Sequence, residues 1–386
     1  MLERDIKKHI LDMAKEYSVL TIVGPRQSGK TTLVKMLFPN HEYVNLEEAD
    51  IREFARKHPR DFFENYSENL IIDEFQRVPE LLSYMQIIVD KENRKGQFIL
   101  TGSHQPQMKA SITQSLAGRT AVITLLPFSI KELSNNGIIL ERDQYIHNGF
   151  MPRIYSENAT PKFLYQNYYS TYVERDVRQL INIGNQNSFE RFIKLLAGRI
   201  GQIVNLNSLA SDVGVSQTTL TSWISVLEAS FIVFRLPCYF ENFGKRQIKA
   251  PKLYFTDVGL AAYLLGIENP EQVFRDPLVG NLFENMVVAE ALKTMYNNGK
   301  NAEIYYFRNQ HGLEIDLLLN KRRNVIPIEV KSSATFDLSF SKNIKLFQKI
   351  SDKIKSGYIV YSGDKTFETE NVKFLNFKDI FSVVPE

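Results

Sequence analysis

The chain has 386 residues, of which 44% are hydrophobic and 24% charged, a composition that excludes a disordered or fibrous protein. At roughly 100–200 residues per domain, this length predicts two to four domains. No apolar run approaches the roughly 18 residues that span a bilayer, and the charged residues 1–5 do not resemble a signal peptide. We therefore expect a cytoplasmic protein with no membrane partner.

Cysteine content and net charge exclude further classes of protein. Cys238 is the sole cysteine, which excludes an intrachain disulfide framework and a cysteine-based zinc site and indicates a reducing compartment. The formal net charge is only +3, so the protein as a whole is not a basic nucleic-acid coat. Any contact with nucleic acid must depend on a local basic patch.

The first third of the chain alternates apolar runs with helical patterns. An amphipathic helix is predicted over residues 3–17, a β-branched strand over 19–23, and a helix over 31–37 after a glycine-rich turn. Further apolar strands are predicted over residues 43–46, 70–73, 98–101 and 121–125. Five buried strands alternating with helices indicate an α/β fold with a parallel sheet.

The alternation stops near Pro127. The patterns that follow predict a tyrosine-rich helix over 163–181, two helices around a tight turn over 205–228, a strand pair within 232–255 and a long helix over 278–296. Later strands are predicted over residues 304–307, 314–319, 325–330, 357–361 and 374–377.

The glycine-rich turn carries a phosphate-binding pattern. Residues 24–31 fit G-x-x-x-x-G-K-[ST], and they follow a buried strand and open a helix, which is the context that the motif requires. Backbone N–H groups would point at phosphate oxygens, Lys30 would reach the β- and γ-phosphates, and the Thr31 hydroxyl would ligate Mg²⁺. The expected ATP-binding residues are Gly24, Pro25, Arg26, Gln27, Ser28, Gly29, Lys30, Thr31 and Thr32.

Two carboxylates end the strand over residues 70–73. Asp73 would complete the Mg²⁺ site, and Glu74 would orient and polarise the attacking water. Ser103, after the next strand, would contact the γ-phosphate or the water, or it belongs to an ordinary strand-end turn. Arg119 is either a catalytic arginine that a neighbouring subunit supplies, which would require a homo-oligomer, or a solvated surface side chain.

These motifs together resemble a bacterial and archaeal family of AAA+ ATPases, AAA_14 followed by the C-terminal domain DUF4143. The resemblance covers nearly the whole chain and implies a P-loop (AAA+/ASCE) sheet, ATP binding and ATP hydrolysis, but little about biological role. The matching segments are residues 24–32, 73–76, 100–103, 116–119, 126–128, 172–177 and 328–332.

Residues 206–228 have the pattern of a helix-turn-helix. Gly214 permits the turn, Ser216 can cap the second helix, and the predicted buried face comprises Leu220, Trp223, Ile224 and Leu227. The exposed side chains of that helix are not basic, but a neighbouring hairpin wing would carry Lys245, Arg246, Lys249 and Lys252. A winged-helix module that contacts DNA phosphates is one interpretation, and a module used for packing or protein contact is the other.

Four charged residues distinguish the C-terminal region: Glu284, Asp316, Glu329 and Lys331. The spacing of Glu329 and Lys331 places both on one face of a strand, and Asp316 would end the neighbouring strand. This arrangement resembles the PD-(D/E)xK core of restriction-endonuclease-like folds, although Ile315 replaces the usual proline. Asp316 and Glu329 would then bind a divalent cation, with Glu284 and Lys331 beside it. A degenerate core that binds nucleic acid or protein without cleavage is the alternative.

The predicted organisation has four parts: an ATPase core (1–145), a helical lid or connector (146–190), a winged-helix-like module (191–268) and a nuclease-like domain (269–386). We expect a Mg²⁺-dependent AAA+-type ATPase that couples nucleotide turnover to a C-terminal region that binds DNA or RNA or cleaves it. The alternatives are a nucleotide-dependent switch whose C-terminal domain docks a protein partner, and an effector nuclease that the ATPase controls.

Overall fold

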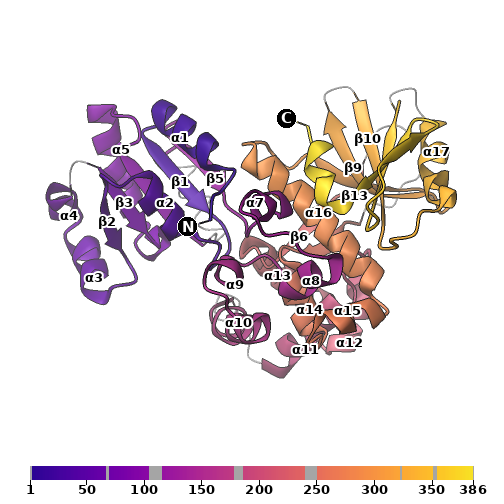
Figure 1. The fold of residues 1–386 in the computed structure, drawn as a ribbon. Helices are drawn as coiled ribbons and strands as arrows, with labels where there is room; N and C mark the ends of the chain where they lie inside the picture. The colour runs from indigo at the N-terminus through magenta and orange to yellow at the C-terminus, as the bar shows by residue number, and fades with distance from the viewer. Residues whose placement is uncertain are drawn as a thin grey trace.

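The computed structural model of the chain describes residues 2–66, 69–103, 115–177, 186–239, 250–321, 324–350 and 354–385. Figure 1 shows an N-terminal sheet with its helices on the left, a second sheet on the upper right, and a group of helices below and between them. The predicted α/β class is confirmed, with a parallel sheet in the N-terminal part and a mixed sheet in the C-terminal part. The winged-helix and nuclease-like assignments remain predictions.

The N-terminal sheet has five parallel strands among the described residues, in the order β2-β3-β4-β1-β5. The β1 side chains are all buried, as the predicted β-branched run requires of a strand covered on both faces. The strands are β1 (Val19–Val23), β2 (Glu42–Asn45), β3 (Leu70–Asp73), β4 (Phe98–Gly102) and β5 (Thr120–Thr124).

Helices cover both faces of this sheet. Alternate strand residues divide the core in two: α1 and α2 cover the side chains of one face, and α4 and α5 cover those of the other. The predicted first helix starts four residues late, at Lys7, because the preceding residues bond to the segment 129–136 instead. The helices are α1 (Lys7–Glu16), α2 (Lys30–Leu37), α3 (Ala49–Lys57), α4 (Pro59–Asn65), the 3₁₀-helix η1 (Phe75–Arg77) and α5 (Leu81–Glu92).

A series of helices follows the sheet. They are α7 (Ile130–Asn135), α8 (Arg142–Asn148), α9 (Pro152–Ser156), α10 (Pro161–Tyr168) and α11 (Gln186–Ala197). The predicted tyrosine-rich helix begins as α10 and continues as a π-helix, η2 (Tyr169–Val177). The wider π-helical turn keeps Tyr168, Tyr172 and Val177 on one buried face. Residues 178–181 of this prediction lie outside the described residues.

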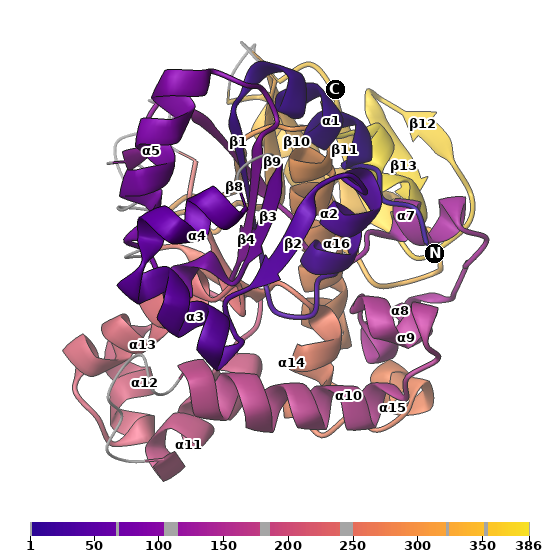
Figure 2. The ribbon, with the colours of Figure 1, turned by 90° about the vertical axis from the view of Figure 1, so that its left-hand side faces the viewer.

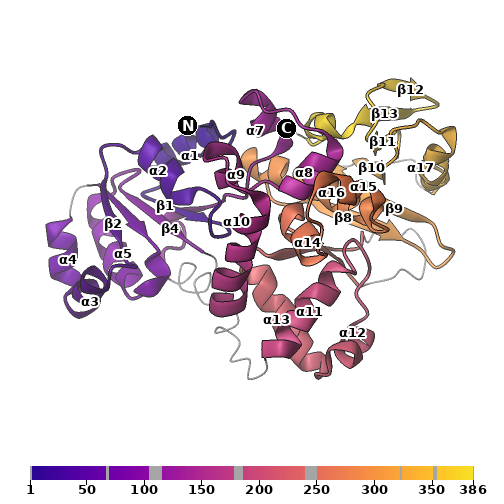
Figure 3. The ribbon, with the colours of Figure 1, turned by 60° about the horizontal axis from the view of Figure 1, so that its bottom comes forward.

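The predicted helix pair is present as α12 (Leu206–Val213) and α13 (Gln217–Ala229). Gly214 adopts a left-handed conformation with φ of 80°, and the Ser216 hydroxyl accepts a hydrogen bond from the Thr219 N–H, as a cap should. All four side chains of the predicted apolar face of α13 are buried. The antiparallel strands β6 (Val233–Leu236) and β7 (Lys252–Phe255) follow, and Figure 3 shows α11, α12 and α13 grouped away from both sheets.

The C-terminal part contains the long helix α16 (Val279–Asn297) and a mixed sheet of six described strands in the order β12-β13-β11-β10-β9-β8. The strands are β8 (Ile304–Arg308), β9 (Glu314–Lys321), β10 (Asn324–Lys331), β11 (Gly357–Tyr361), β12 (Phe367–Thr369) and β13 (Val372–Asn376). The helices around them are α14 (Val258–Leu264), α15 (Pro270–Arg275), η3 (Leu338–Ser341), α17 (Lys342–Gln348) and η4 (Phe377–Ser382).

Helix α16 connects the parts of the molecule. It is buried over most of its length in a core that extends from Leu126 to Val384, and Figure 2 shows it upright behind the N-terminal strands. Its Glu290 carboxylate accepts a 2.6 Å hydrogen bond from the Ile130 N–H, and its Lys293 ammonium donates to the Phe128 carbonyl at 2.8 Å. The chain leaving the N-terminal sheet is therefore fixed to α16.

No helix among the described residues combines the length and the apolar character needed to cross a bilayer.

Candidate functional site

The carboxyl ends of β1, β3 and β4 meet at one edge of the N-terminal sheet. The parallel register pairs Val23 with Gly102 and Asp73 with Thr101, so the residues that follow each strand come together there. The glycine-rich loop follows β1, Glu74 follows β3 and Ser103 follows β4. The structure thus brings together the predicted residues of three separate motifs.

Both glycines of the loop are required by its geometry. A Cβ atom at position 24 would lie 2.0 Å from the Leu125 carbonyl oxygen, so only glycine fits between β1 and the end of β5. Gly29 has φ of 88° at the start of α2, a left-handed conformation that other residues rarely adopt. The loop backbone therefore closes tightly in front of the first turn of α2.

Lys30 places a buried cation inside this loop. Its ammonium group donates hydrogen bonds to the carbonyls of Gly24 at 3.0 Å and Pro25 at 2.8 Å. Burial lowers the pKa of Lys30 to about 8, while Glu74 and Asp73 act in the opposite direction. An anion bound in the loop would stabilise the charged amine, so the residues present fit a nucleotide phosphate.

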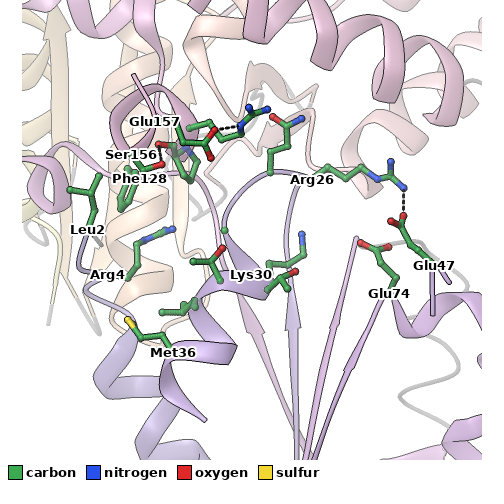
Figure 4. Close-up of a pocket in the computed structure, with 17 residues that line it drawn as sticks. Leu2, Arg4, Arg26, Lys30, Met36, Glu47, Glu74, Phe128, Ser156 and Glu157 are labelled. Carbon is green, nitrogen blue, oxygen red and sulfur yellow. Dashed lines mark hydrogen bonds and ion pairs between the residues drawn. The ribbon is translucent and has the colours of Figure 1, made fainter. Parts of the chain in front are cut away.

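The remaining loop residues lie around this cation. Gln27 and Thr32 line a pocket, Ser28 is fully buried, and Pro25 supplies a carbonyl partner to Lys30. Arg26 points away from the ammonium and pairs with Glu47 at 3.4 Å (Figure 4). Its guanidinium carbon also lies 5.3 Å from the centre of the Tyr172 ring.

Three hydroxyl groups surround the Asp73 carboxylate. The Thr31 hydroxyl donates to Asp73 Oδ2 at 2.7 Å, and the Thr101 hydroxyl donates to Oδ1. Tyr43 also donates to Oδ2, at 2.9 Å, and burial beside Asp73 raises the pKa of this phenol. Hydroxyl and carboxylate oxygens are the ligands that Mg²⁺ prefers, so Thr31 and Asp73 fit the expected ion. Tyr43 was missed, because nothing in its strand marks it as facing Asp73.

Glu74 has a strained backbone and a half-buried carboxylate. Its φ of 55° is left-handed, which is uncommon for a residue with a side chain and frequent at functional sites. Burial is the main cause of its raised pKa, and the positive charge of Lys30 opposes that effect. Its carboxylate accepts a hydrogen bond from the Gln76 amide.

A pocket of about 460 Å³ opens beside the loop, and Figure 4 shows side chains from several segments around it. Residues outside the loop that line it include Leu2, Arg4, Met36, Phe128, Pro152 and Arg153. Arg4 is buried and donates to the carbonyls of Ser28 at 3.1 Å and Leu126 at 2.6 Å, while its Nε pairs with Glu132 at 2.9 Å. These residues were missed because no local motif links positions 2, 128 and 152.

Arg119 does not belong to this site. It immediately precedes β5 and lies at the opposite edge of the sheet, where its backbone carbonyl accepts from the Val19 N–H. Its exposed guanidinium is paired with Asp90 of α5, with Nη2 to Oδ2 at 2.8 Å. A role across a subunit interface stays a prediction.

The predicted C-terminal residues also converge. Lys331 Nζ lies 2.6 Å from Glu329 Oε2 and 3.8 Å from Asp316 Oδ2, because β9 and β10 pair in antiparallel register. Glu284 of α16 approaches the same cluster. Burial, followed by the charge of Asp316, raises the pKa of Glu329 to about 8 and that of Glu284 to about 7.

Lysines balance much of this negative charge. Lys331 contacts two of the carboxylates, and the Lys252 ammonium of β7 lies 3.0 Å from Glu284 and 2.7 Å from Glu314. Asp316 and Glu329 therefore have a lysine partner in this structure, and the divalent cation expected beside them stays a prediction. In the described ranges, no group of three or more His, Cys, Asp or Glu side chains is arranged to hold a metal ion.

The prediction that Lys252 belongs to a phosphate-binding wing is wrong, because the residue is buried. Its side chain is only 4% exposed and is committed to two glutamates, so it cannot contact DNA phosphates in this arrangement. The strand pair was predicted, but its inward-facing lysine was taken as a surface charge. Lys245, Arg246 and Lys249 lie outside the described residues.

Family models match three consecutive parts of the chain. The AAA domain matches residues 16–134, the domain of unknown function DUF8612 matches 140–271, and the domain of unknown function DUF4143 matches 279–380. The resemblance carried by the motifs is thus confirmed for the N-terminal and C-terminal parts. The chain is thus similar to an AAA domain over residues 16–134 and to two domains of unknown function over the rest of the matched length.

Two similar proteins that align with most of the chain are described only as uncharacterized. An uncharacterized protein of Mycobacterium tuberculosis is 28% identical over 352 residues, which cover 90% of this chain and 77% of the relative. An uncharacterized protein of Methanocaldococcus jannaschii is 22% identical over an alignment that covers 100% of this chain and 88% of the relative.

Similar solved structures include a Walker-type ATPase of Pyrococcus abyssi. It is 14% identical with a TM-score of 0.43, over 68% of this chain and 96% of that one. A RuvB variant of Thermotoga maritima is 19% identical with a TM-score of 0.31, over 61% of this chain and 90% of that one.

The placement of Lys252 predicts the effect of its removal. Lys252→Met should lower the free energy of unfolding by about 3–5 kcal/mol, because it leaves buried carboxylates without their partner. Urea denaturation measures the loss, and Lys345→Met is the control, since Lys345 forms an exposed pair with Glu370. Unchanged stability together with weaker DNA binding would instead make Lys252 a phosphate contact.

Proposed function

We propose that the protein is a Mg²⁺-dependent ATPase whose nucleotide chemistry depends on Lys30, Thr31, Asp73 and Glu74. The observation that carries the proposal is the convergence of the glycine-rich loop with the two carboxylates at one sheet edge. Of these residues, Lys30 supplies a buried cation, and Asp73 accepts a hydrogen bond from the Thr31 hydroxyl at 2.7 Å. Glu74 follows Asp73 and accepts a hydrogen bond from the Gln76 amide. This separation of roles is what phosphoryl transfer to water requires.

Each group has a distinct task. The loop N–H groups and the first turn of α2 would hold the β- and γ-phosphates, with Lys30 between them. Thr31 and Asp73 would hold Mg²⁺, which neutralises charge on the phosphate oxygens when bound. Glu74 would orient a water molecule and accept its proton, and Ser103, buried at the end of β4, would donate a hydrogen bond to the γ-phosphate. The pocket beside the loop has room for the rest of the nucleotide.

Two substitutions separate binding from hydrolysis. Lys30→Ala should abolish tight ATP binding, because the buried cation is lost. Glu74→Gln should keep the dissociation constant for ATP but lower the turnover rate by about 100-fold to 10,000-fold, the usual contribution of a general base. Calorimetry and phosphate release measure the two effects.

Glu92→Gln is the control for the Glu74 substitution. Glu92 accepts a hydrogen bond from Gln97, as Glu74 does from Gln76, but it ends α5, away from the loop. Turnover by Glu74→Gln at the wild-type rate would remove Glu74 from the catalytic role. Tight ATP binding by Lys30→Ala would contradict the phosphate site itself.

The C-terminal cluster supports a second candidate function, which is metal-dependent action on nucleic acid. The observation that favours it is that carboxylate oxygens of Asp316 and Glu329 both lie within 3.8 Å of the Lys331 side-chain nitrogen. The alternative is a docking domain for a protein partner, and neutralisation of the cluster by Lys252 and Lys331 supports that reading. In either case the ATPase would act on what the C-terminal part binds, and homo-oligomers, DNA and RNA remain candidate partners.

A metal titration distinguishes these two interpretations. If the site is catalytic, Asp316→Ala should lose both Mn²⁺ binding at this cluster and cleavage, whereas Lys331→Ala should lose cleavage and keep most of the metal affinity. Calorimetry with Mn²⁺ and incubation with single-stranded DNA, duplex DNA and RNA measure both properties. The titrations should be made in a Lys30→Ala background. This variant should not bind ATP tightly, so metal that accompanies bound nucleotide does not contribute to the heat of Mn²⁺ binding.

The docking interpretation predicts a different result. Wild-type protein should leave every nucleic acid uncut and show no Mn²⁺ binding that Asp316→Ala abolishes. That outcome would rule out the nuclease function and leave the ATPase proposal intact.

A further inference from the structure

Gln76 links the ends of two strands at the nucleotide site. It lies in η1, the 3₁₀-helix that follows Glu74. Its Nε2 donates both to the Glu74 carboxylate and to Ser103 Oγ, the latter at 3.2 Å. A primary amide nitrogen carries two hydrogens, so each of these acceptors receives one. The nitrogen must face Glu74, because an ionised carboxylate only accepts hydrogen bonds.

Gly102 makes room for this amide. A Cβ atom at position 102 would lie 2.2 Å from Gln76 Oε1 and 3.2 Å from its Cδ. The amide therefore packs directly against the backbone of β4, where Oε1 is buried and has no hydrogen-bond partner within the described part of the chain. Two independent features, the donor geometry and the absence of a side chain at Gly102, hold the amide in one place.

We propose that Gln76 is a positioning residue for ATP hydrolysis, which orients Glu74 and Ser103 at the same time. The inference rests on the proposed ATPase function. Donation to Glu74 Oε2 leaves the other carboxylate oxygen to take a proton from water. Donation to Ser103 Oγ occupies a lone pair of that hydroxyl, so its own hydrogen is directed to another acceptor, such as the γ-phosphate.

Positioning of this kind acts on the turnover rate more than on nucleotide binding. Among the described residues, Gln76 is absent from the walls of the pocket, and the hydrogen bonds of Lys30 and Thr31 go to other residues. Its loss would leave the phosphate-binding loop unchanged but allow the Glu74 carboxylate to rotate. A misplacement of a catalytic group by about 1 Å can lower the reaction rate by about 100-fold.

The test uses two variants that disturb the amide in different ways. Gln76→Leu removes both donors, and Gly102→Ala leaves Gln76 in the sequence but forces its amide away. Each should lower kcat by about 10-fold to 100-fold while KM and the dissociation constant of a fluorescent ATP analogue stay within about threefold. Thermal melting confirms that the variants are folded.

Gln97→Leu is the matched control. Gln97 is a buried glutamine whose Nε2 donates to a glutamate, Glu92 at 2.9 Å. Like that of the half-buried Gln76, its Oε1 is buried and has no partner among the described residues. It precedes β4 and so lies at the opposite edge of the sheet. Wild-type kcat in Gln97→Leu, with reduced kcat in the other two variants, would support the proposal.

A double substitution tests whether Gln76 acts through Glu74. Adding Gln76→Leu to Glu74→Gln should lower the single-turnover rate by less than it does in the wild-type background, because the residue being oriented is already disabled. Full multiplication of the two effects, or wild-type kcat in Gln76→Leu, would overturn the inference. Absence of ATP hydrolysis by wild-type protein that binds ATP would instead refute the proposed function, and the inference with it.

Discussion

The parallel pairing of β1, β3 and β4 is the constraint on which the candidate nucleotide site depends. Each strand contributes only one short polar sequence, and the residues concerned are up to 79 positions apart between Gly24 and Ser103. The register that pairs Val23 with Gly102 and Asp73 with Thr101 brings these sequences to one edge. Buried strand side chains on both faces stabilise that register, because a shift would expose them.

The site is also attached to the rest of the molecule. Arg4 bonds to the Ser28 and Leu126 carbonyls and to Glu132 of α7, which fixes the loop to the chain leaving β5. Lys293 and Glu290 of α16 bond to the same chain two and four residues beyond Leu126, at Phe128 and Ile130. Helix α16 also carries Glu284, so one buried helix physically joins the candidate nucleotide site and the C-terminal carboxylate cluster.

Much of the fold could be predicted from local patterns. The apolar runs predicted β1 and β3 with their observed bounds, and Gly214 and Ser216 predicted the turn between α12 and α13. These elements depend on short-range chemistry: β-branched packing, a left-handed glycine and a side-chain cap. The change from α10 to a π-helix was not predicted, since it depends on how its tyrosines pack against distant segments.

Only part of each candidate site could be predicted from the sequence. Lys30, Asp73 and Glu74 belong to recognisable motifs, whereas Arg4 and Tyr43 act through contacts with distant positions. Gln76 lies in the matching segment 73–76 but was given no role, because its contact with Ser103 depends on the pairing of β3 with β4. Lys252 shows the opposite error, because a lysine close to other basic residues was taken as exposed, although it is buried between Glu284 and Glu314. A pattern of charge in the sequence does not reveal whether a strand residue faces solvent or another domain.

The most direct test of the account is a crystal structure of Glu74→Gln with ATP and Mn²⁺, in which anomalous scattering locates the metal. We predict a manganese peak beside the Thr31 hydroxyl and the Asp73 carboxylate, with the γ-phosphate against the Lys30 ammonium. A structure with ATP bound elsewhere, or with no metal beside Thr31 and Asp73, would contradict the assignment of this sheet edge as the ATPase site.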